Sequence, residues 1–207
     1  GEMSKKVGVI DLQCGNISSL CRSLSAEVSN LEIIDSRFDP QLFSHIILPG
    51  VGAYKFGMQQ IFRLGMEEPL REFCVDRQMP TLGICLGMQL MCSTSAEFGM
   101  HNGLDFVSGK VEELPEGNDR VPNIGWQSIE SDIKSYFSFI DHRDTFYFVH
   151  SYFCELAEDI DQATITFSGQ PICVAFKKTN LIGVQFHPEK SQKSGEKIIK
   201  NFLQANE

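Results

Sequence analysis

The chain has 207 residues, of which 42% are hydrophobic and 22% are charged, and its formal net charge is −9. At about 150 residues per domain, this length predicts one domain that needs no disulfide or metal to fold. The composition excludes a disordered, collagen-like or coiled-coil protein. The acidic charge disfavours nucleic acid as a partner, because phosphate groups repel an acidic surface. No apolar run reaches the roughly eighteen residues of a membrane helix, so no membrane association is expected.

The start of the chain and its cysteines predict a cytoplasmic protein. Gly1 and Glu2 precede Met3 and are interpreted as a tag remnant, and residues 1–5 are expected to form a disordered start. The apolar segment Val7–Ile10 is too short for the core of a signal peptide. The chain has seven cysteines, an odd number, and no two of them form a Cys-x-x-Cys pair. Neither a disulfide framework nor a metal site is therefore predicted. Most of these cysteines are expected to be small buried hydrophobes.

The first half of the sequence alternates strand-like and helix-like segments. Short apolar runs bounded by turn residues predict strands, and apolar residues at helical spacing predict helices. The predicted strands are Val7–Ile10, Leu31–Ile34, His45–Leu48 and Thr81–Ile84, and the predicted helices span 16–26, 56–62, 66–77 and 86–94. This alternation predicts an α/β fold with a mostly parallel central sheet and helices on both faces.

The second half is richer in short β-like segments around glycine and proline. Leu104–Val111, Ile172–Phe176 and Leu181–Phe186 are expected to extend the sheet with antiparallel strands. The segment Ser194–Ala205 places apolar side chains on one face of a closing helix. Because no repeat, low-complexity tract or linker interrupts the pattern, a single domain over residues 1–207 is predicted.

A glycine-flanked cysteine lies between the predicted strand Thr81–Ile84 and the helix that follows it. In Gly83-Ile84-Cys85-Leu86-Gly87, glycines stand two positions before and two after the cysteine. This is the nucleophile-elbow pattern, in which a tight turn lifts the nucleophile above the sheet edge. At a helix N-terminus the thiolate, which is the reactive form, is favoured. A buried cysteine in a glycine-rich turn is the alternative interpretation.

A second motif supplies a base for that cysteine. The apolar strand ending at Phe186 is followed by His187-Pro188-Glu189. In an extended segment residues i and i+2 face the same side, so Glu189 is expected to orient His187, which acts as a base toward Cys85. A polar turn would explain the same residues taken alone, but the pair of motifs favours a Cys-His-Glu catalytic triad.

A third motif, Pro49-Gly50-Val51-Gly52, follows the strand His45–Leu48. Its glycines allow the backbone to turn N–H groups toward a ligand at the carboxyl end of a parallel strand. We interpret it as half of an oxyanion hole, with the Leu86 amide as the other half. A plain turn between a strand and a helix is the alternative.

These three motifs resemble the triad-type, class I glutamine amidotransferases. Further stretches resemble the glutaminase subunit of imidazole glycerol phosphate synthase: Val-Pro-Asn-Ile-Gly-Trp-Gln at 121–127, Phe-Tyr-Phe-Val-His-Ser-Tyr at 146–152, the opening Asp11…Gly15-Asn16, and the tail Gly183…His187-Pro188-Glu189-Lys190-Ser191. The resemblance spans about 7–203, which leaves no room for a synthase domain.

The resemblance implies a glutaminase that passes ammonia to a separate (βα)8-barrel subunit, which makes imidazole glycerol phosphate, and that needs no cofactor or metal. It implies that Cys85 attacks the glutamine amide, that His187 protonates the departing ammonia, and that the Val51 and Leu86 amides hold the oxyanion. The residues implied to bind glutamine are Gly50, Gly52, Gln89, Glu97, Ser151 and Tyr152. The residues implied to face the barrel are Asn16, Pro122, Asn123, Trp126, Tyr147 and Lys190.

Two positions depart from the family pattern. The family segment usually reads Val-Pro-His-Met-Gly-Trp-Asn, whereas this chain has Asn123 and Gln127 at the third and last places. Neutral drift and a changed partner surface both explain the departures. Because the rest of the sequence resembles the subunit of imidazole glycerol phosphate synthase, histidine biosynthesis is the leading expectation. The alternatives are a paralogue that supplies ammonia for amidating surface-polysaccharide sugars, a free-standing γ-glutamyl hydrolase, a cysteine hydrolase acting on peptides, and a non-enzymatic binding module.

Overall fold

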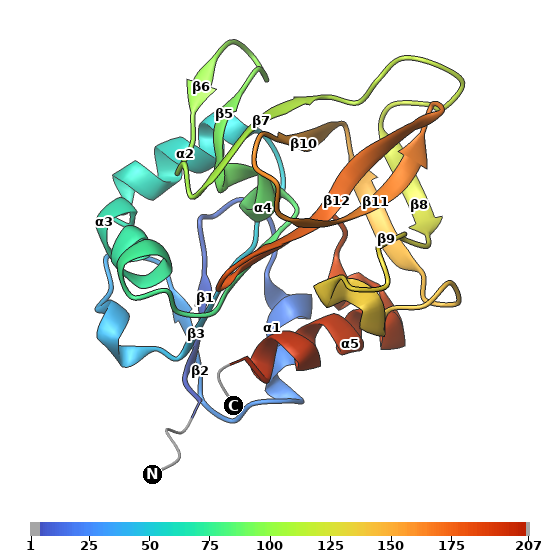
Figure 1. Ribbon diagram of the computed structural model, residues 1–207. Coiled ribbons are helices and arrows are strands. Elements are labelled where there is room, and N and C mark those ends of the chain that lie inside the picture. Colours follow the sequence, from blue (N-terminus) through green and yellow to red (C-terminus); the bar gives the residue numbers. More distant parts are fainter. Residues whose placement is uncertain (1–4, 206–207) are drawn as a thin grey trace.

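A seven-stranded sheet with helices on both faces forms the centre of the protein (Figure 1), as seen in a computed structural model that describes residues 5–205. The strand order is β11-β12-β13-β4-β3-β1-β2. The strands are β1 (Val7–Ile10), β2 (Leu31–Ile34), β3 (His45–Leu48), β4 (Thr81–Ile84), β11 (Asp161–Phe167), β12 (Gln170–Lys178) and β13 (Leu181–Val184). The predicted α/β class is confirmed. Most of the predicted tag remnant and start, residues 1–4, lies outside the described residues.

Strand directions follow the length of the connections. The first four strands and β13 run parallel to one another, whereas β12 is antiparallel to both β11 and β13. Parallel neighbours need a long crossover, and the helical segments supply it in the first half of the chain. A two-residue turn joins β11 to β12, and another joins β12 to β13, so these neighbours are antiparallel. The predicted antiparallel extension is confirmed for Ile172–Phe176, while the strand within Leu181–Phe186 pairs with β4 in parallel.

Two hydrophobic cores lie on opposite faces of the central sheet. One contains side chains of α1 (Ser18–Ser25) and α5 (Gln192–Leu203), and the other contains side chains of α2 (Tyr54–Arg63), α3 (Glu67–Arg71) and α4 (Leu86–Leu90). Figure 1 shows α1 and α5 on one side of the sheet and α2 and α3 on the other. The apolar face predicted for the last helix is buried as expected: Ile198, Ile199, Phe202 and Leu203 are each at most 4% exposed.

Several elements differ from the sequence-based expectation because tertiary contacts decide them. The helix predicted over 86–94 ends at Leu90, and the chain enters a strand, β5 (Cys92–Ser95), which pairs with β6 (His101–Asn102) and β7 (Val107–Glu113). The segment Leu104–Val111, expected in the central sheet, therefore contributes to β7 of a second sheet with order β10-β7-β5-β6. The helix predicted over 66–77 divides into α3 and a wider π-helical turn, η2 (Glu72–Asp76).

A separate two-stranded sheet was not predicted and proves important for the site. It consists of β8 (Asn123–Gln127) and β9 (Phe146–His150), and β10 (Tyr152–Leu156) follows β9 after one residue. We refer to β8 and β9 as the β8–β9 hairpin. The remaining short elements are the 3-10 turns η1 (Pro40–Leu42), η3 (Tyr136–Phe139) and η4 (Pro188–Lys190).

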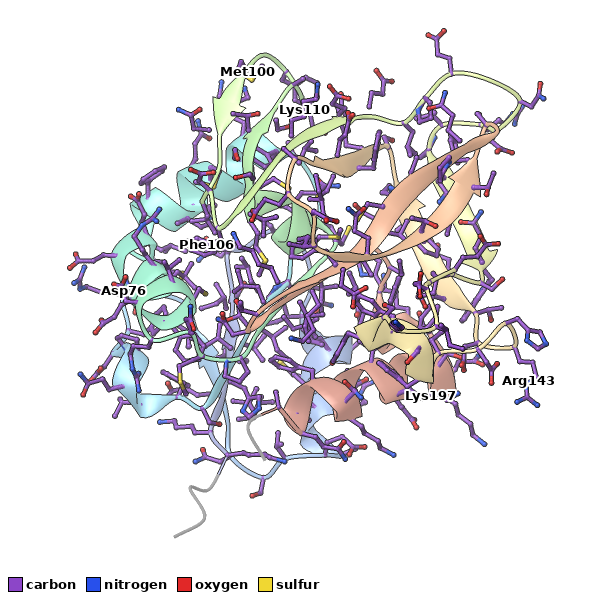
Figure 2. The ribbon with its side chains drawn as sticks, in the orientation of Figure 1. Asp76, Met100, Phe106, Lys110, Arg143 and Lys197 are labelled. Atoms are coloured by element: carbon purple, nitrogen blue, oxygen red, sulfur yellow. The ribbon has the colours of Figure 1, made fainter. Side chains whose placement is uncertain are left out.

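Charged side chains lie on the outer surface of the molecule (Figure 2), and some of them connect the loop before β9 to the last helix by ion pairs and hydrogen bonds. Lys197 of α5 pairs with Asp144, in the loop before β9, at 2.8 Å, while the neighbouring Arg143 extends into solvent. Asp144 also accepts a hydrogen bond from Ser194 at 2.8 Å. Within the described residues, no helix has the length and apolar character needed to cross a bilayer.

The helix α5 packs closely against the turn η4, and Gly195 allows this contact. A Cβ atom at Gly195 would lie 1.8 Å from the carbonyl oxygen of Pro188. We therefore expect Gly195→Ala to destabilise the protein by about 1–3 kcal/mol, even though alanine is the better helix former by about 1 kcal/mol.

Urea unfolding measures this effect, and Glu196→Ala, at an exposed position of the same helix, is the matched control. The control should be neutral or slightly stabilising. Equal stability of Gly195→Ala and Glu196→Ala would contradict the close packing of α5 on η4.

Candidate active site

Cys85 occupies a strained turn between β4 and α4. Its backbone has φ +56° and ψ −111°, a region that non-glycine residues rarely adopt, and its N–H donates to the Val184 carbonyl at 2.8 Å. A Cβ at Gly83 would lie 2.9 Å from the backbone of Gly87, and a Cβ at Gly87 would lie 1.6 Å from the Leu48 carbonyl oxygen. The turn therefore requires both glycines, as the elbow pattern predicts.

His187 and Glu189 form a buried, hydrogen-bonded pair. The Nδ1 atom of His187 lies 2.7 Å from a carboxylate oxygen of Glu189, and their side chains are 4% and 10% exposed. The expected pairing is present, but the reason given for it was wrong. Glu189 lies in the 3-10 turn η4, which begins at Pro188, and not in an extended segment. The backbone of His187 is also held, because its N–H donates to the Tyr147 carbonyl at 3.0 Å.

The electrostatic environment favours a charged His187. Burial disfavours the imidazolium, but hydrogen bonding and charge interactions with Cys85 and Glu189 outweigh it and raise the pKa of His187 to about 9. The buried Nε2 atom has no well-aligned hydrogen bond in this conformation. Catalytic hydrogen bonds are often long before substrate binds, so this geometry fits a base that acts on the nearby thiol.

Gln185 contacts the nucleophile and was missed by the sequence analysis. Its side chain is fully buried, and its Nε2 donates to the sulfur of Cys85 at 3.7 Å. Its Oε1 accepts from Nε2 of Gln89 at 3.1 Å, and the same Gln89 nitrogen is 3.2 Å from the Tyr152 carbonyl oxygen. The alternation of side chains along a strand cannot predict this contact, because it depends on how two segments 100 residues apart pack together.

A cavity of about 380 Å³ opens onto the sulfur of Cys85. Most residues that the resemblance assigned to glutamine lie in its wall. The lining residues are Val51, Gly52, Cys85, Leu86, Gln89, Glu97, Pro122, Val149, His150, Ser151 and Tyr152. Of the predicted set, Gly50 instead lines a smaller cavity beside His187 and Glu189. Glu97 accepts a hydrogen bond from the Tyr54 N–H at 2.8 Å, which fixes its carboxylate at the start of α2.

The predicted oxyanion hole is not formed in this conformation. The Val51 N–H donates to the Cys14 carbonyl at 2.9 Å, and the Leu86 N–H donates to the Gly50 carbonyl at 3.0 Å. Both proposed donors are therefore occupied. One peptide unit is responsible for both contacts, because the Gly50 carbonyl and the Val51 N–H belong to the same peptide bond. Rotating that peptide by half a turn would release the Leu86 N–H and turn the Val51 N–H away from Cys14.

Five of the six predicted partner-facing residues are accessible, and one is not. Asn16, Pro122 and Lys190 are exposed, Tyr147 is half-buried, and Trp126 is 49% exposed. The rings of Trp126 and Tyr147 lie side by side on the outer face of the β8–β9 hairpin, with centroids 5.9 Å apart. Asn123 is only 5% exposed and faces inward, because side chains alternate across the strand. Its assignment as a surface contact was wrong.

All seven cysteines, which lie within the described part of the chain, are free thiols. No group of three or more His, Cys, Asp or Glu side chains among residues 5–205 is arranged to hold a metal ion. Cys85 lines the larger cavity, interacts with His187, and has a sulfur that accepts a hydrogen bond from the Gln185 amide. The arrangement of thiol, imidazole and carboxylate is suited to nucleophilic attack on a carbonyl carbon.

The raised pKa of His187 predicts how stability depends on pH. In the folded protein the proton is retained up to about pH 9, whereas a free imidazole loses it near 6.5. The interactions of the charged His187 with Cys85 and Glu189 therefore contribute their full stabilisation below pH 6.5, and the contribution is lost as the pH rises through about 9. We expect the wild type to have a higher free energy of unfolding than Glu189→Gln. This difference should be largest near pH 6.5 and should shrink toward pH 9.

Urea unfolding at a series of pH values tests this expectation. Glu196→Gln, which removes an exposed carboxylate from α5, should differ from the wild type by a nearly constant amount. A difference between wild type and Glu189→Gln that grows with pH would show that His187 is not held charged by Glu189.

Comparison with known proteins places the chain in one family. Residues 9–205 match the family described as glutamine amidotransferase class-I. The chain is 37% identical over 200 residues to the imidazole glycerol phosphate synthase subunit HisH of Chlorobaculum tepidum, covering 96% of this chain and 99% of that protein. It is 40% identical over 204 residues to the subunit of the same name from Chlorobium chlorochromatii, with coverage of 96% and 99%.

Solved structures share the fold at low sequence identity. The structure of PurLQS from Thermotoga maritima has a TM-score of 0.73 at 14% identity and covers 97% of this chain and 98% of that chain. A putative GMP synthase subunit from Thermoplasma acidophilum has a TM-score of 0.72 at 19% identity, with coverage of 98% and 94%. The family match over nearly the whole sequence establishes that this chain belongs to the class I glutamine amidotransferases.

Proposed function

We propose that this chain is the glutaminase subunit of an imidazole glycerol phosphate synthase and serves histidine biosynthesis. It hydrolyses glutamine to glutamate and ammonia and passes the ammonia to a partner subunit. Relatives from several species that are named as this subunit support the histidine pathway. These names do not favour the alternative of a paralogue for sugar amidation. The observation that carries the chemistry is Cys85 at a cavity of about 380 Å³, beside the buried His187–Glu189 pair.

The reaction follows from the positions of the three side chains. His187 holds the proton that the thiol of Cys85 has given up, and the thiolate attacks the side-chain amide carbon of glutamine. The tetrahedral intermediate collapses as His187 protonates the departing nitrogen, so ammonia leaves and a γ-glutamyl thioester remains on Cys85. His187 then takes a proton from water, which attacks the thioester carbon and releases glutamate. Glu189 keeps the imidazole oriented with Nε2 toward the sulfur throughout.

The cavity walls suit a substrate with charged ends and an amide side chain. Glu97 supplies a carboxylate for the α-ammonium group, and the backbone around Ser151 and Tyr152 supplies polar groups along the opposite wall. Gln89 is held by Gln185 and the Tyr152 carbonyl, which leaves its Oε1 to accept a hydrogen bond from glutamine. Gly52, at φ +104°, leaves open space where a side chain would otherwise enter the cavity.

We infer that the partner is a (βα)8-barrel protein that docks on the outer face of the β8–β9 hairpin. Trp126 and Ile124 are 49% and 61% exposed there, an unusual exposure for large apolar side chains that is typical of a docking surface. Tyr147 lies beside Trp126 on this face, and the resemblance assigns Pro122, Lys190 and Asn16 to the same interface. A free-standing γ-glutamyl hydrolase would have no use for this surface.

Replacing the nucleophile tests the assignment of Cys85. Cys85→Ala should lower glutamine-dependent synthesis by the complex about a thousandfold or more, because triad members act as a unit. Synthesis driven by added ammonia should be unchanged, since the partner's site does not need the thiol. Cys21→Ala, at a half-buried position in α1, is the control and should retain both activities. Near-normal glutamine-dependent turnover in Cys85→Ala would overturn the assignment.

The occupied oxyanion donors predict that the protein without its partner is a nearly silent glutaminase. In the resting conformation both the Val51 and Leu86 N–H groups are bonded to backbone carbonyls. Losing one oxyanion donor costs about 2.7–4 kcal/mol in the transition state, or roughly a hundred- to a thousandfold in rate. We expect glutamate release to rise by about that factor when the partner and its acceptor substrate bind and favour the rotated Gly50–Val51 peptide.

The measurement compares glutamate release by the isolated protein, by the complex with the partner, and by the complex with acceptor bound. Gly52→Ala should reduce the activated rate, because its φ of +104° is strained for a side chain. Full activity of the isolated protein, unchanged by any partner, would contradict the switch and support a free-standing hydrolase.

A further inference from the structure

A polar network fills the inner face of the β8–β9 hairpin, next to the cavity. The strand register places Asn123 directly opposite His150, and the two side chains are 5% and 6% exposed. The Nδ2 atom of Asn123 lies 3.0 Å from Nε2 of His150 and 3.0 Å from Oε1 of Gln127. On its other side, Nδ1 of His150 lies 2.9 Å from the Tyr152 carbonyl oxygen. The two positions that depart from the family pattern, Asn123 and Gln127, therefore bond to each other.

The partners in this network determine where each proton lies. A carbonyl oxygen only accepts, so Nδ1 of His150 must carry a proton and donate it to Tyr152. A neutral ring has one N–H, so Nε2 of His150 must accept. Asn123 provides the matching donor, with one amide proton for His150 and the other for Gln127. An imidazolium would require the Asn123 amide to turn so that its Oδ1 accepts from His150, and the Gln127 amide would then have to turn as well.

The network continues to the nucleophile. The Tyr152 carbonyl accepts from both His150 and Gln89, Gln89 donates to Gln185, and Gln185 donates to the sulfur of Cys85. Hydrogen bonds thus connect β8 with Cys85 without interruption. The same carbonyl belongs to the segment 151–152 that lines the cavity. A change in the state of His150 would consequently alter both the cavity wall and the donor to the sulfur.

We propose that Asn123 is a positioning residue that holds His150 neutral, as the Nδ1–H tautomer, so that His187, beside Cys85, is the imidazole that carries the proton in glutamine hydrolysis. The proposal deepens the function proposed above and rests on it for its catalytic meaning. The geometry of the network itself does not depend on that function. The role of Asn123 is to donate hydrogen bonds from its side-chain amide, not to contact a partner.

The charge distribution around the cavity supports this role. Burial lowers the pKa of His150 to about 4, with the hydrogen bond to Tyr152 opposing the shift and the positive charge of His187 adding to it. The other titratable groups on the cavity wall are Cys85, Glu97 and the Tyr152 phenol. None of them is hydrogen-bonded to the imidazole of His150, whose two nitrogens are occupied by Tyr152 and Asn123. A charged His150 would repel the charged imidazole of His187.

Nitrogen-15 NMR of histidine-labelled protein tests the proton positions directly, with the His150 signals identified by their loss in His150→Gln. In the wild type we expect a neutral ring with its proton on Nδ1 between about pH 5.5 and 8. In Asn123→Asp a carboxylate replaces the donor, which should bring the pKa of His150 into this range and give an imidazolium at the acid end. Asn102→Asp makes the same change at an exposed site on β6 and should leave the His150 signals unaltered.

Activity of the complex provides a second readout. In Asn123→Asp, kcat/KM for glutamine should fall by about ten- to a hundredfold as the pH drops through the new ionisation, a pH profile that lost packing alone would not produce. Asn123→Ala, which only removes the donor, should lower kcat/KM at all pH values. Synthesis from added ammonia should be unaffected in both variants, because it takes place on the partner, and co-elution of each variant with the partner shows that it folds and binds.

Two results would overturn the proposal. One is a wild-type His150 that carries its proton on Nε2 or is charged in the neutral range. The other is an unchanged His150 spectrum in Asn123→Asp. If the spectra are as expected but the wild-type complex fails to hydrolyse glutamine, the proposed function is wrong while the network assignment holds.

Discussion

The parallel pairing of β4 with β13 is the contact on which the site depends. Ile84 lies opposite Val184, so the residues that follow the two strands emerge at the same edge of the sheet. Cys85 and the Gln185–His187 segment are brought together by this register although about 100 residues separate them in the chain. The Cys85 N–H donates to the Val184 carbonyl. This hydrogen bond extends the pairing of the two strands by one residue and stabilises the strained turn at Cys85. A one-residue slip would move the nucleophile away from its base.

The β8–β9 hairpin connects the outer surface with the catalytic groups. Its outer face presents Trp126 and Tyr147, while the backbone carbonyl of Tyr147 accepts the N–H of His187. Its inner face carries Asn123 and His150, which lead through Tyr152 to the cavity. The hairpin pairs with no other strand of the described structure. A partner that presses on the outer face therefore acts on an element with direct contacts to the base and to the cavity wall.

The parts of the site that depend on residues close together in the chain could be predicted from the sequence. The strand before Cys85, its flanking glycines and the alternation of strands and helices all follow from residues close together in the chain. The end of α4 at Leu90 was not predictable in this way, because pairing of β5 with β7 overrides the apolar helical pattern. Neither Gln185 nor the Asn123–His150 contact has a local signal, since each depends on the register of distant strands. Glu189 was identified correctly, but Pro188 starts a 3-10 turn that the assumed extended geometry did not include.

Covalent labelling with a diazo-ketone analogue of glutamine tests most directly whether Cys85, activated by His187 and Glu189, is the nucleophile. All seven cysteines are free, so mass spectrometry of the digested protein can report which of them reacts. We expect a label on the peptide containing Cys85 alone, at a rate that falls by orders of magnitude in Glu189→Gln. Labelling of another cysteine, or an equal rate at Cys85 in both proteins, would contradict it.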